Sequence, residues 1–357
     1  MDVLIANSKT YKLKDSNTHS LSFLCCIFAV DMISNIQKAV INSKLSLPFA
    51  GVLAFVCWWL NADMGTGYVV TNEGYGWLWS IVPSELITGW TGLGIGALMS
   101  AVAVYLLMEL NNANVLLRAG SRMMGLLLTV FFAVSFSVHV FSVGHIVGVL
   151  ALLAYFFLFA SYQNGGRGFV YVEFMCISLA TLFFPAFIFL VPLYWVALAM
   201  IRSFDMKSLC ASVLGLLTPY WFVVCYAVLA ERLDVFSEHI GMLMEFELFD
   251  YSSLSLHQII VVALALVMFV AGGIEFRVHS FLDKTRIRIL YDTVLILGSG
   301  GFVLLAFLPG YYSALLPFIL VNASIVSGHH LAQCFGKVMN VYTILLILVF
   351  VLLGIGG

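Results

Sequence analysis

The chain has 357 residues, of which 62% are hydrophobic and 10% are charged, and its formal net charge is −2. Soluble domains are about half apolar and about a quarter charged, so this composition excludes an ordinary soluble domain. Lipid cannot satisfy backbone polar groups, which predicts an all-α, polytopic bundle of transmembrane helices. The seven cysteines show no CxxC or Cys/His spacing, so we expect buried apolar thiols and no metal site. No nucleic-acid partner is expected.

Residues 1–31 differ from the rest of the chain. Three lysines precede the apolar run 21–30, which is too short to span a bilayer. A signal peptide fits this pattern, but its cleavage would place the next two lysines outside the membrane. The alternative is translation from Met32. We favour that start, with 1–31 a non-native extension and 32–357 a single integral membrane domain.

About eleven apolar segments follow, and several are shorter than the usual ~20 residues, so tilted or kinked helices are expected. The expected spans are 45–60, 86–108, 123–141, 145–161, 169–184, 185–201, 209–230, 259–275, 291–308, 311–330 and 338–356.

The basic residues predict an orientation. If the N-terminus is cytoplasmic, all of the 16 Lys and Arg residues except Arg232 fall in inner segments. This sorting agrees with the positive-inside bias and predicts a cytoplasmic N-terminus and an outer C-terminus.

The first outer loop, 61–85, is acidic and aromatic. One interpretation is an aromatic belt at the membrane surface. The other is a mouth that handles a sugar or a lipid, in which carboxylates act as bases, indoles stack and an arginine holds phosphate. The candidate catalytic residues would be Asp63, Glu73 and Glu85, and the candidate substrate-binding residues Trp77, Trp79 and Arg232.

Five polar residues lie inside or beside spans. Glu173 lies near the inner end of a span, so we expect its carboxylate to reach the headgroups; a functional intramembrane acid is the alternative. His139 and His145 are six residues apart, which does not fit a helical metal pair and favours interfacial side chains. His329 and His330 should point about 100° apart on a helix, so they should not easily share one ligand.

Three prolines interrupt the central apolar stretch. Pro185 predicts a tight outer turn, while Pro192 and Pro219 predict kinks in the two spans that follow. Broken helices often mark transport paths, although prolines are common in membrane helices.

Three stretches carry a resemblance: Met32-Ile-Ser-Asn, Leu117-Arg118, and the run ATLFFPAFIFLVPLYWVALAMIRSF with the later LLTPYWF. They resemble a family of bacterial multipass membrane proteins that is catalogued as a domain of unknown function. The likeness extends from about Met32 to the C-terminus. It implies a multi-pass protein of the bacterial inner membrane and assigns no reaction, substrate or site residue.

Two later loops differ in charge. The outer loop 231–258 is acidic, which fits a solvated face better than a cation site. The inner loop 275–292 is basic, and attraction to anionic headgroups explains it. A cytoplasmic nucleotide or sugar phosphate is the alternative, without a glycine-rich cradle to support it.

Three functional classes remain open. The chain could be a component of cell-envelope glycan or lipid biogenesis, a transporter of a solute or lipid, or a glycosyltransferase acting on a lipid-linked substrate at the outer face. The lipid bilayer is the expected partner, with glycolipids or envelope-assembly proteins as further candidates. No motif names a cofactor, so the cofactor is unknown.

The expected topology is testable with reporter fusions. Fusions after Tyr162, Phe204 and Leu282 should report cytoplasm, because these positions follow an even number of the expected spans. Fusions after Thr71 and Phe249 should report the outer side. A cytoplasmic signal at Phe249 would contradict the arrangement of eleven spans.

Overall fold

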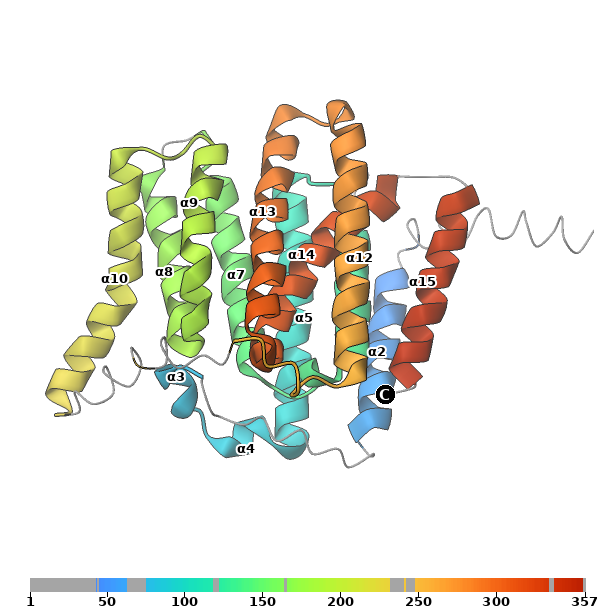
Figure 1. The fold of residues 1–357 in the computed structure, drawn as a ribbon, viewed down its shortest axis with the longest axis horizontal. Coiled ribbons are helices and arrows are strands. Elements are labelled where there is room, and N and C mark those ends of the chain that lie inside the picture. The colour runs from blue at the N-terminus through green and yellow to red at the C-terminus, as the bar shows by residue number, and fades with distance from the viewer. Residues whose placement is uncertain are drawn as a thin grey trace, which may run out of the picture.

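The structure is a computed structural model that describes residues 43, 45–62, 75–117, 122–163, 166–231, 241, 248–333 and 337–355. The expectations for 1–31 therefore lie outside the described residues. Within these ranges the chain is helical and contains no strand. Most of the helices run side by side as a bundle (Figure 1).

The α-helices are α2 Ser46–Ala62, α3 Trp77–Ser80, α4 Ser84–Ile87, α5 Gly89–Asn114, α6 Met123–Val134, α7 Val143–Ala160, α8 Arg167–Phe183, α9 Val191–Met200, α10 Met206–Leu229, α12 Leu256–His279, α13 Thr285–Phe307, α14 Tyr312–Gln333 and α15 Lys337–Ile355. Short 3-10 helices are η1 Phe136–Val138, η2 Pro185–Leu190, η3 Ser280–Leu282 and η4 Pro309–Tyr311.

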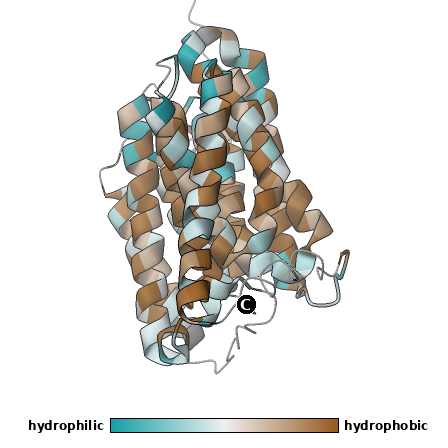
Figure 2. Ribbon diagram, turned by 90° about the vertical axis from the view of Figure 1, so that its left-hand side faces the viewer, coloured by the Kyte–Doolittle hydropathy of each residue, from teal (hydrophilic) through white to brown (hydrophobic). Residues whose placement is uncertain are grey.

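Among the described residues, six helices are long and apolar enough to cross a membrane, namely α5, α7, α10, α12, α13 and the continuous η4–α14 segment. Their length and hydropathy indicate a membrane-embedded protein. Figure 2 shows apolar residues along the middle of the helices and hydrophilic residues concentrated at one end of the bundle. That end carries the turn between α12 and α13 (Figure 1), while α3 and α4 lie at the opposite end.

Several helix ends differ from the sequence-based bounds. Helix α5 continues to Asn114 and α13 begins at Thr285, because polar residues extend both helices beyond their apolar runs. Helix α6 ends at Val134, well short of the expected residue 141. The following backbone leaves the helix to cover α5, where the Phe141 N–H donates to the Gly92 carbonyl at 3.0 Å.

Helix α14 lies at the centre of the bundle. It contacts α6, α7, α12 and α13, and 94% of its most apolar window is buried. Helix α7 approaches it closely through glycines. A Cβ on Gly144 would collide with the Ser313 carbonyl, and one on Gly148 would lie 3.0 Å from Pro317. Small residues at such contacts are typical of membrane helix packing.

Two of the three central prolines, Pro185 and Pro219, lie where the sequence predicted a turn and a helix-interior position, and Pro192 does not. The chain turns at Pro185 as expected, and there η2 begins and leads directly into α9. Pro192 lies in the first turn of α9, where a proline is tolerated, so the predicted kink inside a helix is wrong. Pro219 does lie inside α10, and the lower half of that helix slants away from the bundle (Figure 1).

The start of α10 is capped by Asp205, which accepts the Ser208 N–H at 2.6 Å. Hydrogen bonds from the side chain and backbone of Ser208 hold the pKa of this exposed carboxyl below its usual value. An acceptor at this position satisfies a free N–H group of the first helical turn, which defines where α10 begins.

Two glycines of α5 give a matched test of this packing. A Cβ on Gly96 would lie 2.5 Å from the His139 carbonyl oxygen, whereas one on Gly94 meets nothing within 4 Å. We expect Gly96→Ala to lower the free energy of unfolding by about 1–3 kcal/mol through overpacking. Gly94→Ala should be neutral or stabilise by up to about 1 kcal/mol, since alanine favours a helix. Thermal unfolding in detergent measures both; equal effects would contradict the close α5 contact.

Candidate functional site

The site residues expected from the sequence are placed as follows. Asp63, Glu73 and Arg232 lie outside the described residues. Glu85 is exposed on α4. Trp77 is half-buried on α3, and its ring centroid lies 5.4 Å from that of Tyr226. Of the three expected carboxylates the structure therefore describes only Glu85, and their arrangement as one site stays a prediction.

Trp79 is fully buried at the end of the bundle that carries α3. Its ring centroid lies 5.5 Å from Phe141 and 6.3 Å from Tyr75. The Tyr75 hydroxyl forms a 2.7 Å hydrogen bond with the Ser313 hydroxyl, and burial raises the pKa of Tyr75 while that bond lowers it. The buried Trp79 ring is thus packed against other aromatic side chains of the protein.

The prediction that His139 and His145 are interfacial is wrong. They are 4% and 3% exposed. The His139 Nε2 lies 3.0 Å from the Ala133 carbonyl oxygen. His145 completes a capping box with Ser142 at the start of α7, and its Nε2 lies 3.3 Å from the Ser100 hydroxyl. Both rings have hydrogen-bond partners, which explains their burial.

Glu173 is fully buried, and neither of its carboxylate oxygens has a hydrogen-bond partner among the described residues. The prediction that it reaches the headgroups is therefore wrong. It lies about 9 Å along α8 from Arg167, at 1.5 Å per residue. The buried residues Val170, Phe174 and Ile177 share its face of the helix, and this periodic stripe packs into the bundle. The stripe was visible in the sequence and would have predicted the burial.

Glu173 belongs to a set of buried polar residues that we call the central polar cluster: Glu173 and Cys176 of α8, Tyr194 of α9, Tyr155 of α7 and Asn322 of α14. Tyr194 interacts electrostatically with Glu173, Cys176 and Tyr155, and its hydroxyl has no hydrogen-bond partner among the described residues. The Tyr155 hydroxyl donates to Asn322 Oδ1 at 2.6 Å. Four helices thus contribute polar groups to one interior region.

A second set, the histidine–carboxylate cluster, joins the ends of α12 and α14 and the turn after α12. It consists of Glu275, His279, Asp283, His329 and His330. The Nδ1 atoms of His329 and His330 lie 3.8 and 3.7 Å from the same Glu275 oxygen, Oε2. Glu275 of the neighbouring helix thus approaches both adjacent rings. That the two histidines do not easily share one ligand stays a prediction.

No group of three or more His, Cys, Asp or Glu side chains in the described ranges has a geometry that could hold a metal ion. The basic end of α13 instead makes contacts within the protein. Arg286 donates to Asn114 Oδ1 at 3.0 Å, and its guanidinium lies 5.7 Å from the Tyr162 ring centroid. Arg277 forms a 3.1 Å ion pair with Asp292. These contacts connect α5, α12 and α13 at the end that carries the α12–α13 turn.

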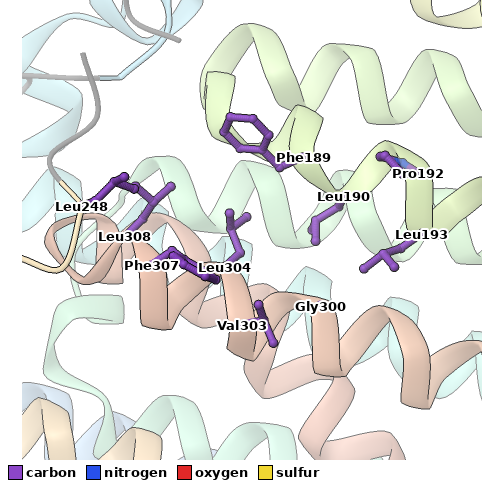
Figure 3. A pocket seen from close by; sticks show the side chains of 10 residues that line it. All are labelled: Phe189, Leu190, Pro192, Leu193, Leu248, Gly300, Val303, Leu304, Phe307 and Leu308. Carbon is purple, nitrogen blue, oxygen red and sulfur yellow. The ribbon is translucent and has the colours of Figure 1, made fainter. Parts of the chain in front are cut away.

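An apolar pocket of about 520 Å³ lies between the η2–α9 segment and α13 (Figure 3). Gly300 of α13 lies on one wall, where a Cβ would collide with Leu193. Phe189 and Phe307 remain 53% and 45% exposed at its walls. The described lining residues carry no polar side chain; they are Phe189, Leu190, Pro192, Leu193, Leu248, Gly300, Val303, Leu304, Phe307 and Leu308.

Comparisons with protein-family models, curated proteins and solved structures found no match to this chain.

The Tyr155–Asn322 hydrogen bond allows a matched stability test. Tyr155→Phe removes the donor to a buried amide oxygen and should cost about 1–3 kcal/mol of unfolding free energy. Tyr194→Phe removes a buried hydroxyl without a described partner and should be neutral or slightly stabilising. Thermal unfolding of both variants in detergent checks this difference. A larger loss for Tyr194→Phe would reverse the assigned roles.

Proposed function

We propose that this chain is a multipass membrane transporter in which Glu173 binds and releases a proton as the solute is moved. The observation that carries the proposal is the fully buried Glu173 carboxylate without a described hydrogen bond. Ionisable residues within membrane helices are costly, and they commonly mark ion or substrate paths. Tyr194 of α9 is equally buried and interacts electrostatically with Glu173, although no hydrogen bond joins the two side chains.

The surroundings favour a carboxyl group that changes its protonation state. An isolated carboxylate inside the bundle costs several kcal/mol, whereas the neutral acid costs much less. Glu173 interacts electrostatically with Tyr194 of α9, a helix that follows a 3-10 segment, and α8 packs against the proline-containing α10. Broken helices beside a buried acid fit a path that opens alternately to the two sides.

The proposed topology has eleven spans in a bacterial inner membrane, with the N-terminus in the cytoplasm. Eleven helical segments in the described ranges coincide in order with the expected spans. The basic α12–α13 turn and the α3–α4 segment lie at opposite ends of the bundle (Figure 1), which supports assigning the first to the inside and the second to the outside.

A component of envelope lipid or glycan biogenesis is the second candidate. The apolar pocket of Figure 3 favours it, because a wall without polar side chains suits an acyl or isoprenoid chain. The glycosyltransferase alternative depends on Asp63, Glu73, Glu85 and Arg232, and only the exposed Glu85 is described.

Carbodiimide labelling tests the protonated state of Glu173 without knowledge of the solute. A carboxylic acid adds across the carbodiimide C=N bond, transfers its proton to nitrogen, and the product rearranges to a stable N-acylurea. We expect apolar dicyclohexylcarbodiimide to modify Glu173 in the intact protein, as detected by peptide mass spectrometry. A water-soluble carbodiimide should modify the exposed Glu85 and spare Glu173.

Proton flux tests the coupling. Proteoliposomes containing a pH-sensitive dye would be challenged with amino acids, sugars and small carboxylates. At least one class should produce an internal pH change that Glu173→Gln abolishes, while Glu85→Gln leaves it intact. Absence of Glu173 labelling between pH 5 and 8, or equal flux in wild type and Glu173→Gln, would overturn the proposal.

A further inference from the structure

His329 lies near the end of α14, and it is 2% exposed. Its ring is packed by two aromatic side chains. The Tyr291 and Phe276 ring centroids lie 4.6 and 5.4 Å away, and both rings meet the imidazole edge to face. This packing from α13 and α12 limits the orientations that the imidazole can adopt. Its two nitrogen atoms therefore face defined partners.

Both nitrogens of His329 face a carboxylate. Nδ1 lies 3.8 Å from Glu275 Oε2, and Nε2 lies 3.4 Å from Asp283 Oδ2. Glu275 belongs to α12, whereas Asp283 follows η3 in the turn to α13. The imidazole of α14 thus lies between acceptors from two other parts of the chain.

This arrangement distinguishes the protonation states of the ring. A neutral imidazole has one N–H and can donate to only one carboxylate, so its other nitrogen presents a lone pair to a negative oxygen. An imidazolium has two N–H groups and can donate to Glu275 and Asp283 together. Hydrogen bonds between two charged groups are shorter and stronger than neutral ones. The geometry therefore has a place for one additional proton.

Gln333 offers a partner for the neutral ring. Its Nε2 lies 2.9 Å from His329 Nε2, so the amide can donate to a neutral imidazole nitrogen. Rotation of the amide would present its oxygen to an imidazolium N–H instead. Gln333 and Asp283 therefore both lie close to His329 Nε2. A neutral nitrogen favours the contact with the Gln333 amide N–H, whereas a protonated nitrogen favours the contact with the Asp283 carboxylate.

Other titratable groups surround the site on each neighbouring element. His279 Nδ1 lies 3.1 Å from Glu275 Oε1, and His330 Nδ1 lies 3.7 Å from Glu275 Oε2. Asp292 forms a 3.1 Å ion pair with Arg277. The phenols Tyr291 of α13 and Tyr342 of α15 also lie close to these histidines, the latter beside His330. Three imidazole rings thus approach the two oxygens of the Glu275 carboxylate.

We propose that His329, together with Glu275 and Asp283, forms a proton-binding site that fastens the end of α14 to α12 and to the α12–α13 turn. With the proton bound, the imidazolium bridges the two carboxylates. Without it, the ring is held by Gln333 and one carboxylate contact is lost. The site is separate from Glu173 and does not depend on the transport proposal.

Nitrogen-15 NMR of histidine-labelled, full-length protein in detergent tests proton binding directly. We expect both ring nitrogens of His329 to show imidazolium shifts at pH 5.5, with the resonance assigned by its loss in His329→Gln. If that variant does not fold, the shift caused by Asp283→Asn provides the assignment. A neutral His329 at pH 5.5 would overturn the proposal.

Thermal unfolding provides the second readout. The bound proton gains two acceptors only in the folded state, so the stabilisation is present at acid pH and is lost as the pH rises. His329→Gln should therefore lower the unfolding midpoint at least about 2 °C more at pH 5.5 than at pH 8. Glu275→Gln and Asp283→Asn should each reduce this pH-dependent difference.

The control is His257→Gln, at the other end of α12. The His257 ring stacks on Phe136 at 4.3 Å, and no described carboxylate lies within ion-pair distance. Its replacement should not reproduce the larger loss at acid pH. The same decrement at both pH values for His329→Gln, or the acid-dependent loss for His257→Gln as well, would contradict the assigned site.

Discussion

Enclosure of α14 is the constraint on which the rest of the structure depends. Four helices surround it, so neither lipid nor water satisfies most of the polar groups that it carries. Asn322 therefore obtains its hydrogen bond from Tyr155 of α7. His329, about two turns further along, faces carboxylates of α12 and of the following turn. A single buried helix thus determines where its neighbours must place polar side chains.

Close approach of those neighbours depends on small residues at a few positions. Gly144 and Gly148 bring α7 against Pro317 of α14, and Gly272 of α12 lies 2.9 Å, measured from an ideal Cβ, from Val326. Gly298 of α13 similarly leaves room for Asn322. Without side chains at these points, the helices approach closely enough for short polar side chains to meet. The polar contacts between these helices therefore depend on the close packing that the glycines permit.

The two polar clusters differ in how their charges are balanced. Glu173 has no described cation or donor beside it, so its energy depends on whether it carries a proton. The carboxylates near His329 face ionisable rings and can be neutralised within the protein. The first arrangement suits a group that exchanges a proton as part of a cycle. The second suits a contact whose strength follows the protonation of histidine.

The sequence by itself determined that the chain is an all-helical membrane protein and approximately where its apolar helices lie, because continuous apolar runs directly reflect burial in lipid or protein. The sequence also contained the periodic stripe on α8 that includes Glu173, although the composition of the chain does not reveal such a stripe. Only the tertiary structure decided which face of each helix meets protein. A helix without a distinct apolar stripe, such as α14, does not indicate in its sequence which neighbours it meets. For the same reason the contacts of His329 and His330 with Glu275 could not be predicted. They depend on the relative positions of α12 and α14, and the residues that meet are 54 and 55 positions apart in the sequence.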